Sequence, residues 1–215
     1  MTSSKEVGMK HVLVECLGTF FLVLVVGLTG IAPGAGEMAP VAIGAMLMVM
    51  VYAGGHISGA HYNPAVTLAV WLRGKCDAKD VPAYMGAQVV GAVIAALLVG
   101  VCKRGSYITA LQPDVWPALL IELVFTFALA YVVLNVATAK KTAGNSYFGL
   151  AIGFTVMAAA YAGGRISGGA FNPAVAIGIT LMGLSTVGNL WIFLLGNLAG
   201  GALASVVFRV TNPDD

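Results

Sequence analysis

The strongest constraint on this chain is a set of six long apolar runs that are nearly free of charged residues. A helix needs about 20 apolar residues to cross the hydrocarbon core of a bilayer. Several runs reach that length, and the two shorter ones lead into glycine-rich segments that can extend them. The chain is therefore predicted to be an all-α integral membrane protein with spans at residues 12–32, 39–53, 81–101, 117–137, 148–162 and 190–207.

The composition supports this class and excludes others. Charged residues make up only 9% of the chain, whereas soluble domains carry roughly 25%, so this chain has too few to cover a water-facing surface. The net charge of +2 gives no indication of nucleic-acid binding. The cysteines, Cys16, Cys76 and Cys102, lack the spacing of metal ligands, and neither a metal site nor a cofactor is predicted.

The distribution of basic residues predicts the orientation. Eight of the eleven fall before the first span, after even-numbered spans or after the last span; they are Lys5, Lys10, Arg73, Lys75, Lys79, Lys140, Lys141 and Arg209. Lys103, Arg104 and Arg165 lie on the other side. Because basic residues favour the cytoplasmic face, both termini are predicted to be cytoplasmic, as an even number of spans requires. The first run is interrupted by Glu15 and lacks a cleavage site, so it is predicted to be an uncleaved span rather than a signal peptide.

One glycine-rich phrase occurs twice, half a chain apart. YAGGHISGAHYNPAV begins at Tyr52 and YAGGRISGGAFNPAV at Tyr161, with 11 of 15 positions identical at an offset of 109. VAIG at residues 41–44 recurs as LAIG at 150–153. The chain is therefore predicted to be a single membrane domain, residues 1–215, built from repeats at about 1–105 and 106–215. Three spans per repeat force the two repeats into opposite orientations.

Each Asn-Pro is followed by a short apolar stretch, at residues 64–74 and 173–183. Pro is favoured at the first helical position, so Asn63 and Asn172 are predicted to cap helices of about ten residues. Such helices reach about half way across the membrane. The preceding segments, 54–62 and 163–171, are predicted to be non-helical backbone, which is tolerated at membrane depth only beside protein or a wet cavity.

Two half-helices that meet at the midplane would create a site for small uncharged solutes. Their N-termini each carry about half a positive charge, which repels cations and protons. The Asn side chains can cap their helices with oxygen and direct N–H groups into a pore. The residues before each Asn can present carbonyl acceptors; they are Gly59, Ala60, His61, Gly168, Gly169 and Ala170.

The duplicated NPA motifs (Asn63, Pro64 and Ala65; Asn172, Pro173 and Ala174), the GHISGAHYNPAV wording and the glutamates Glu15 and Glu122 resemble the aquaporin, or major intrinsic protein, family. The resemblance covers essentially the whole chain. It implies an hourglass fold, passive permeation of water and small neutral solutes, a homotetramer with one pore per subunit, and a plasma or inner membrane. It also implies that each glutamate braces the re-entrant loop of its own half by accepting N–H groups.

The outer selectivity filter departs from the family pattern. Water-selective members have Arg after the second NPA, a His on span five and an aromatic residue on span two. The matching positions, taken by ungapped distance from each Asn, are Ile43, Ala160, Gly169 and Val175, and a slip of one residue would replace Ala160 by Tyr161. Val at this place is similar to plant tonoplast intrinsic proteins and some bacterial members of the family, which implies passage of urea, ammonia, peroxide or metalloid hydroxides. Glycerol facilitators usually have the pattern NPARD at the second motif; this chain has neither that Arg nor that Asp, so passage of glycerol remains an open alternative.

Two further residues have open roles. His56 either lines the cytoplasmic side of the pore or packs structurally. Arg165, at the matching position of the second half, either brackets loop carbonyls near the filter or acts as a structural brace.

Three alternatives to a broad channel remain: a strictly water-selective channel, an ion-coupled inverted-repeat transporter and a membrane enzyme. A transporter needs a titratable site at midplane, yet the only acidic residues of the spans are Glu15 and Glu122. An enzyme is disfavoured because no nucleophile–base pair is evident.

Overall fold

The computed structural model describes residues 8–215, and Lys5 of the N-terminal basic cluster lies outside that range. All regular secondary structure in this part of the chain is helical, and it contains no strand. The α-helices are α1 (Met9–Gly30), α2 (Ala39–Ser58), α3 (Pro64–Leu72), α4 (Val81–Cys102), α5 (Val115–Val133), α6 (Phe148–Ser167), α7 (Pro173–Leu181) and α8 (Leu190–Thr211). Short turns of other helix types are η1 (Gly36–Met38), η2 (Leu134–Thr138), η3 (Lys140–Thr142) and η4 (Val187–Asn189).

The predicted spans and half-helices are confirmed. Six helices are long and apolar enough to cross a membrane, and they correspond to the six apolar runs. Between them, α3 and α7 have nine residues each, or about 14 Å at 1.5 Å per residue. Both lengths are close to the predicted ten residues, and each helix is followed by a turn that leads to a left-handed glycine, Gly74 or Gly183.

The prediction that residues 54–62 and 163–171 are non-helical is wrong for the first part of each segment. Helix α2 continues to Ser58 and α6 to Ser167, so only four residues separate each helix from the next Asn. Gly59 and Gly168 end these helices at φ values of 88° and 102°, where a residue with a side chain would be strained. The earlier glycines preserve helical hydrogen bonding and instead allow close packing, since a Cβ on Gly54 would overlap the Tyr62 hydroxyl.

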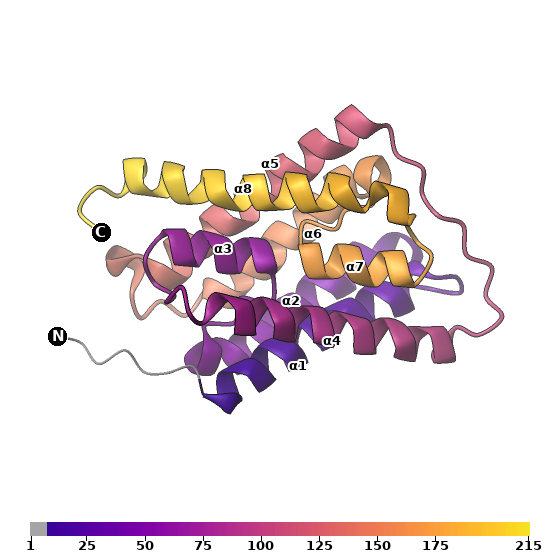
Figure 1. Ribbon diagram of the computed structural model, residues 1–215, viewed down its shortest axis with the longest axis horizontal. Coiled ribbons are helices and arrows are strands. Elements are labelled where there is room, and N and C mark those ends of the chain that lie inside the picture. Colours follow the sequence, from indigo (N-terminus) through magenta and orange to yellow (C-terminus); the bar gives the residue numbers. More distant parts are fainter. Residues whose placement is uncertain (1–7) are drawn as a thin grey trace.

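The helices form two matching groups around the half-helices. Helix α1 packs against α4, α5 packs against α8, and α2 crosses α6 between the two groups. Helices α3 and α7 lie nearly end to end at the centre of Figure 1, and the C-terminus and the start of α1 lie at the same end of the molecule. The predicted repeat boundary at residue 105 falls in the segment that joins α4 to α5.

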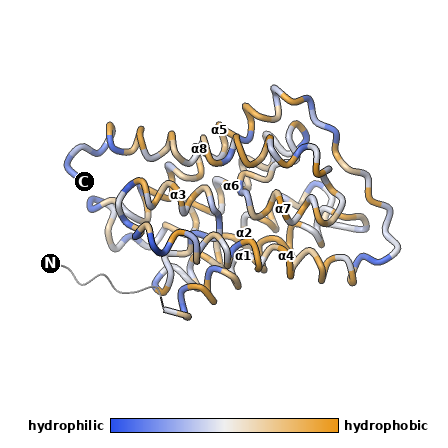
Figure 2. The backbone as a smooth tube through the Cα atoms, in the orientation of Figure 1, coloured by the Kyte–Doolittle hydropathy of each residue, from blue (hydrophilic) through white to orange (hydrophobic). Residues whose placement is uncertain are grey.

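The crossing of α2 and α6 depends on one glycine from each copy of the repeated VAIG/LAIG phrase. A Cβ on Gly44 would lie 2.7 Å from the Gly153 carbonyl oxygen, and a Cβ on Gly153 would lie 2.6 Å from Met48 Cβ. Small residues at such a crossing let two helix backbones approach closely, which drives helix association inside a membrane. The backbone in Figure 2 is mostly apolar along the helices, with hydrophilic segments gathered at the two ends of the molecule.

Candidate functional site

The N-termini of the two half-helices meet through their Asn caps. Asn63 Oδ1 accepts a hydrogen bond from the Ala65 N–H at 2.8 Å, and Asn172 Oδ1 accepts one from the Ala174 N–H at 2.9 Å. Both Asn residues are in extended conformation and are followed by Pro, the arrangement predicted for an N-cap. The positive ends of both helix dipoles therefore point to the middle of the molecule.

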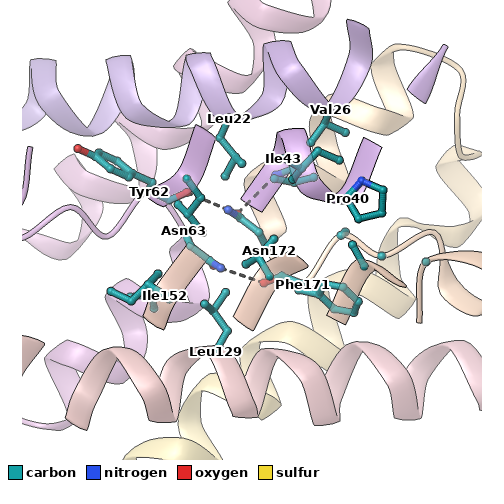
Figure 3. A pocket seen from close by; sticks show the side chains of 18 of the residues that line it. Leu22, Val26, Pro40, Ile43, Tyr62, Asn63, Leu129, Ile152, Phe171 and Asn172 are labelled. Carbon is teal, nitrogen blue, oxygen red and sulfur yellow. Dashed lines mark hydrogen bonds between the residues drawn. The ribbon is translucent and has the colours of Figure 1, made fainter. Parts of the chain in front are cut away.

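Each Asn amide also bonds the loop of the opposite half. Asn63 Nδ2 donates to the Phe171 carbonyl at 2.9 Å, and Asn172 Nδ2 donates to the Tyr62 carbonyl at 2.8 Å; Figure 3 shows both bonds. An amide group has two N–H donors, so one donor on each Asn remains beyond this cross-link. The sequence analysis did not predict these bonds, which hold the two loops to each other.

Glu15 braces the first loop. Its carboxylate accepts hydrogen bonds from the backbone N–H groups of His61 and Tyr62 at 2.9 and 2.7 Å, and from the Ser58 hydroxyl at 2.7 Å. Gln88 on α4 donates a fourth bond at 2.8 Å. The side chain of Glu15 is fully buried. These contacts are those expected of the bracing role that the family resemblance implies.

Glu122 makes the equivalent contacts in the second half. It accepts from the N–H groups of Ala170 and Phe171 at 3.0 and 2.7 Å, and from the Ser167 hydroxyl at 2.7 Å. It is also fully buried. Asn197 on α8 lies beside it and accepts a bond from the Thr126 hydroxyl at 2.9 Å.

The sequence analysis missed Gln88 and Asn197. They lie 109 positions apart, the same offset as the repeated phrase, and that spacing is the signal that could have identified them. Ser58 and Ser167 share this offset and sit inside the phrase itself.

The hydrogen bonding of the loops leaves carbonyl groups available. Every N–H from Ala60 to Tyr62 and from Gly169 to Phe171 is taken by the glutamate or the serine of its own half. Within residues 8–215, no hydrogen bond reaches the carbonyl oxygens of the six predicted acceptors, Gly59, Ala60, His61, Gly168, Gly169 and Ala170. Positive φ values at Ala60 (52°), Tyr62 (49°) and Phe171 (48°) show that the loop backbone is held in a strained path.

A central cavity of about 180 Å³ passes between the two Asn caps. Its wall includes all four predicted filter positions, Ile43, Ala160, Gly169 and Val175, and five of the six predicted carbonyl residues. Gly59 instead lines the openings toward the end where the C-terminus lies. Most of the remaining wall is aliphatic, from residues such as Leu22, Val26, Leu129 and Ile152 (Figure 3). In the part of the chain described, no Asp, Glu, Lys or Arg lines this cavity.

The structure separates the two candidates for the position on α6. Ala160 lines the cavity, whereas Tyr161 is 52% exposed and does not form part of its wall. His56 does not line the central cavity. It is exposed and lines a second, wider cavity of about 510 Å³ that shares Ile152 with the first.

Arg165 does not line the central cavity in the described part of the chain. Its side chain is 93% exposed and makes one contact, an ion pair of 3.9 Å with Glu37 of η1. It donates no hydrogen bond to a loop carbonyl within the described range. Arg165 lies two residues before Ser167, the last residue of α6, and its side chain is exposed, whereas Ser167 is buried and donates to Glu122.

Six spans, two half-helices that meet at their N-termini and a narrow cavity between them define the hourglass class of multi-pass membrane proteins. Residues 1–208 match the profile of the family described as "Major intrinsic protein", and the chain belongs to that family.

Several named relatives align with nearly the whole chain. Aquaporin NIP1-4 of Oryza sativa subsp. japonica is 38% identical over 94% of this chain and 78% of its own length. Glycerol uptake facilitator protein-like 6 of Lactiplantibacillus plantarum is 34% identical over 96% of this chain and all of its own. The aquaglyceroporin structure from Plasmodium falciparum superimposes with a TM-score of 0.79, at 21% identity over 95% of this chain and 97% of the other, and it shows a similar fold.

Proposed function

We propose that the protein is a passive channel for water and small uncharged solutes, and that these cross through the central cavity past Asn63 and Asn172. The observation that carries the proposal is the pairing pattern of the re-entrant loops. The N–H groups of residues 60–62 and 169–171 are occupied by Glu15, Glu122 and the serines, while six carbonyls have no donor within residues 8–215. A neutral solute that sheds water in the cavity finds these acceptors and the remaining Asn donors.

The outer part of the cavity favours solutes larger than water. An Arg after the second NPA would fill space and offer fixed donors, but Val175 presents two methyl groups. Ile43, Ala160 and Gly169 add no aromatic ring and no charge. Because an unpaired polar group costs roughly 1–3 kcal/mol to desolvate, the loop carbonyls must carry most of the hydrogen bonding. Urea, glycerol, peroxide, ammonia and metalloid hydroxides are the solute class that this wall fits.

The same geometry opposes cations and protons. Two half-helix N-termini at the midplane place a positive potential where a permeating ion would be least hydrated. Each Asn has one N–H donor left at this point, so a water molecule that accepts from both Asn residues cannot also accept from its neighbour in the file. The filter Arg is therefore not required for proton exclusion in this chain.

Two alternatives are less well supported. An ion-coupled transporter needs a free titratable group at the midplane, and both span glutamates are fully occupied in bracing the loops. A strictly water-selective channel needs a narrow polar filter, whereas the four filter positions are small or aliphatic. The enzyme alternative is set aside because the chain belongs to a family of channels.

We also propose that the end of the molecule that carries the C-terminus is cytoplasmic. The supporting contacts gather the basic residues there: Asp215 bonds both the Arg73 guanidinium at 2.6 Å and the Lys140 N–H at 2.9 Å, and Arg209 donates to the Leu72 carbonyl. Lys103 holds the Ile31 carbonyl at the opposite end. A homotetramer in a plasma or inner membrane completes the proposal, and native mass spectrometry of the detergent complex tests the subunit count.

The test is urea efflux from proteoliposomes measured with and without sodium, potassium and proton gradients. A passive channel gives an efflux rate that is independent of these gradients and rises in proportion to the urea concentration. Efflux that saturates and requires one of the gradients would instead identify a coupled transporter.

A further inference from the structure

The wider cavity at the cytoplasmic end has a chemistry unlike that of the central cavity. It measures about 510 Å³ and lies between α2, the loop before α4, and the η2–η3 region. Three side chains that can carry positive charge line it, His56, Lys75 and Lys140, and none of its described lining residues is an Asp or Glu.

The hydroxyl and amide side chains on this wall already use their donors. Thr138 donates its hydroxyl to the Leu134 carbonyl at 2.6 Å, and Thr142 donates to the Asn135 carbonyl. The Asn145 amide donates to the carbonyls of Val136 and Thr142 at 2.7 and 2.6 Å. An occupant of the cavity therefore meets acceptors from these side chains and finds its side-chain donors on the basic residues.

Lys75 is the basic side chain with the most N–H donors still available for an occupant of the cavity. Within residues 8–215 its ammonium group has no carboxylate within 4.0 Å and makes no hydrogen bond. Asp77 and Asp80 share a neighbouring opening with it without forming an ion pair. Lys140 uses one of its three N–H donors on the Asp214 carbonyl at 3.0 Å, and the His56 ring has no partner in the same range.

We propose that this cavity binds the phosphate group of a small soluble anion, held by Lys75 with His56 and Lys140, and that the bound anion obstructs the cytoplasmic mouth. A multiply charged oxyanion satisfies more of the three groups than a single carboxylate does, and lysine is a common phosphate ligand. Since Ile152 lines both cavities, an occupant stands on the route to the centre. The obstruction rests on the proposed channel function, whereas the binding itself does not.

Two measurements test the site with inorganic phosphate as the probe. The first is the phosphorus NMR line width of phosphate mixed with detergent-solubilised protein. The second is the urea efflux rate from proteoliposomes with phosphate on both sides, divided by the rate in chloride of equal ionic strength. A site with a Kd of about 1 mM would be about 90% occupied at about 10 mM phosphate. We expect line broadening and a several-fold lower efflux rate.

The matched variants are Lys75→Gln and Lys79→Gln, which remove the same charge from the same exposed loop, and Lys79 lies outside the cavity wall. Loss of a charged hydrogen bond should weaken phosphate binding about ten-fold in Lys75→Gln and leave it unchanged in Lys79→Gln. Lys75→Arg should restore most of the binding. Each variant serves as its own reference, because the efflux ratio is taken with and without phosphate.

Several results would overturn the proposal. They are an absence of line broadening, equal broadening in the two glutamine variants, or broadening without slower efflux. Inhibition that occurs only in vesicles containing phosphatidylglycerol, and not with free phosphate, would assign the site to a lipid headgroup instead. If the unmodified protein passed no solute, the proposed channel function would be refuted. The line-width comparison would still test whether the cavity binds phosphate.

Discussion

Replacing Glu122 by Ala should cost the protein much of its stability, because the carboxylate is the acceptor for a buried stretch of loop. The substitution removes the partner of the Ala170 N–H, at 3.0 Å, and of the Phe171 N–H, at 2.7 Å. The Ser167 hydroxyl retains a weak alternative in the Gly163 carbonyl at 3.5 Å. Each backbone N–H left buried without an acceptor costs about 1–3 kcal/mol, so the expected loss is about 2–6 kcal/mol.

The stability of the conservative variant Glu122→Gln should fall between that of the unmodified protein and that of Glu122→Ala. Its amide oxygen can still accept a hydrogen bond from one of the two backbone N–H groups. Its NH₂ group is placed against the other N–H group, and two donors cannot bond each other. We expect about half of the alanine effect, and a lower efflux rate per folded molecule because the carbonyls of Gly169 and Ala170 lose their fixed positions. The control is Glu37→Ala, which removes the same charge from a side chain that is 90% exposed and should change stability by less than about 0.5 kcal/mol.

The assay is unfolding in mixed micelles titrated with a denaturing detergent and followed by tryptophan fluorescence. Efflux is then measured on the fraction that elutes as folded protein. If Glu122→Ala were as stable as Glu37→Ala, the carboxylate would not hold the loop, and the reasoning from buried donors would be refuted.

Three further substitutions test Val175 at the predicted filter, Arg165 near the end of α6 and Gly153 at the α2–α6 crossing. Val175→Arg should reduce urea efflux about ten-fold more than water flux, because it adds volume and fixed donors to an apolar constriction; stopped-flow light scattering measures both. Arg165→Ala should leave urea flux and cation exclusion within about two-fold of the unmodified protein, since its one ion pair is exposed. Gly153→Val should destabilise the fold by about 1–3 kcal/mol at the α2–α6 crossing, whereas Gly86→Ala, where a Cβ meets nothing within 4 Å, should not.

Each of these three predictions has an outcome that would contradict it. Equal loss of water and urea flux in Val175→Arg would remove Val175 from the filter. A large change in ion exclusion in Arg165→Ala would show that Arg165 acts at the pore. Identical unfolding curves for the two glycine variants would mean that the crossing of α2 and α6 tolerates a side chain.

The fold was largely predictable because it follows from two local features of the sequence, the apolar runs and the Asn-Pro and Gly residues that bound the half-helices. Spans need only sustained hydropathy, and the half-helices follow from Asn-Pro at one end and Gly shortly past the other. The ends of α2 and α6 were predicted too early. Glycine permits an extended path but does not require it, and the residue that stops each helix is the one with positive φ, Gly59 or Gly168.

The filter positions could be located by counting, because helices have a fixed rise per residue and the two loops have equal length. Ile43 and Ala160 therefore fall on the cavity wall as the ungapped distance from each Asn predicts. Their role as a selectivity filter stays a prediction.

Other parts of the site depend on tertiary placement that no local pattern encodes. The bond from each Asn amide to the opposite loop joins Asn63 to Phe171, 108 residues apart. Arg165 was assigned by its match to His56, but the two side chains have different surroundings: His56 lines a basic cavity, whereas Arg165 is exposed and pairs with Glu37.

The most direct test of the account measures urea efflux and proton entry in the same proteoliposomes, with a pH-sensitive dye inside. The structure has unpaired carbonyls and two Asn caps along an uncharged route, and it predicts fast urea and water flux with proton entry no faster than in protein-free vesicles. Rapid proton entry through the unmodified protein, or water flux without any urea flux, would contradict it.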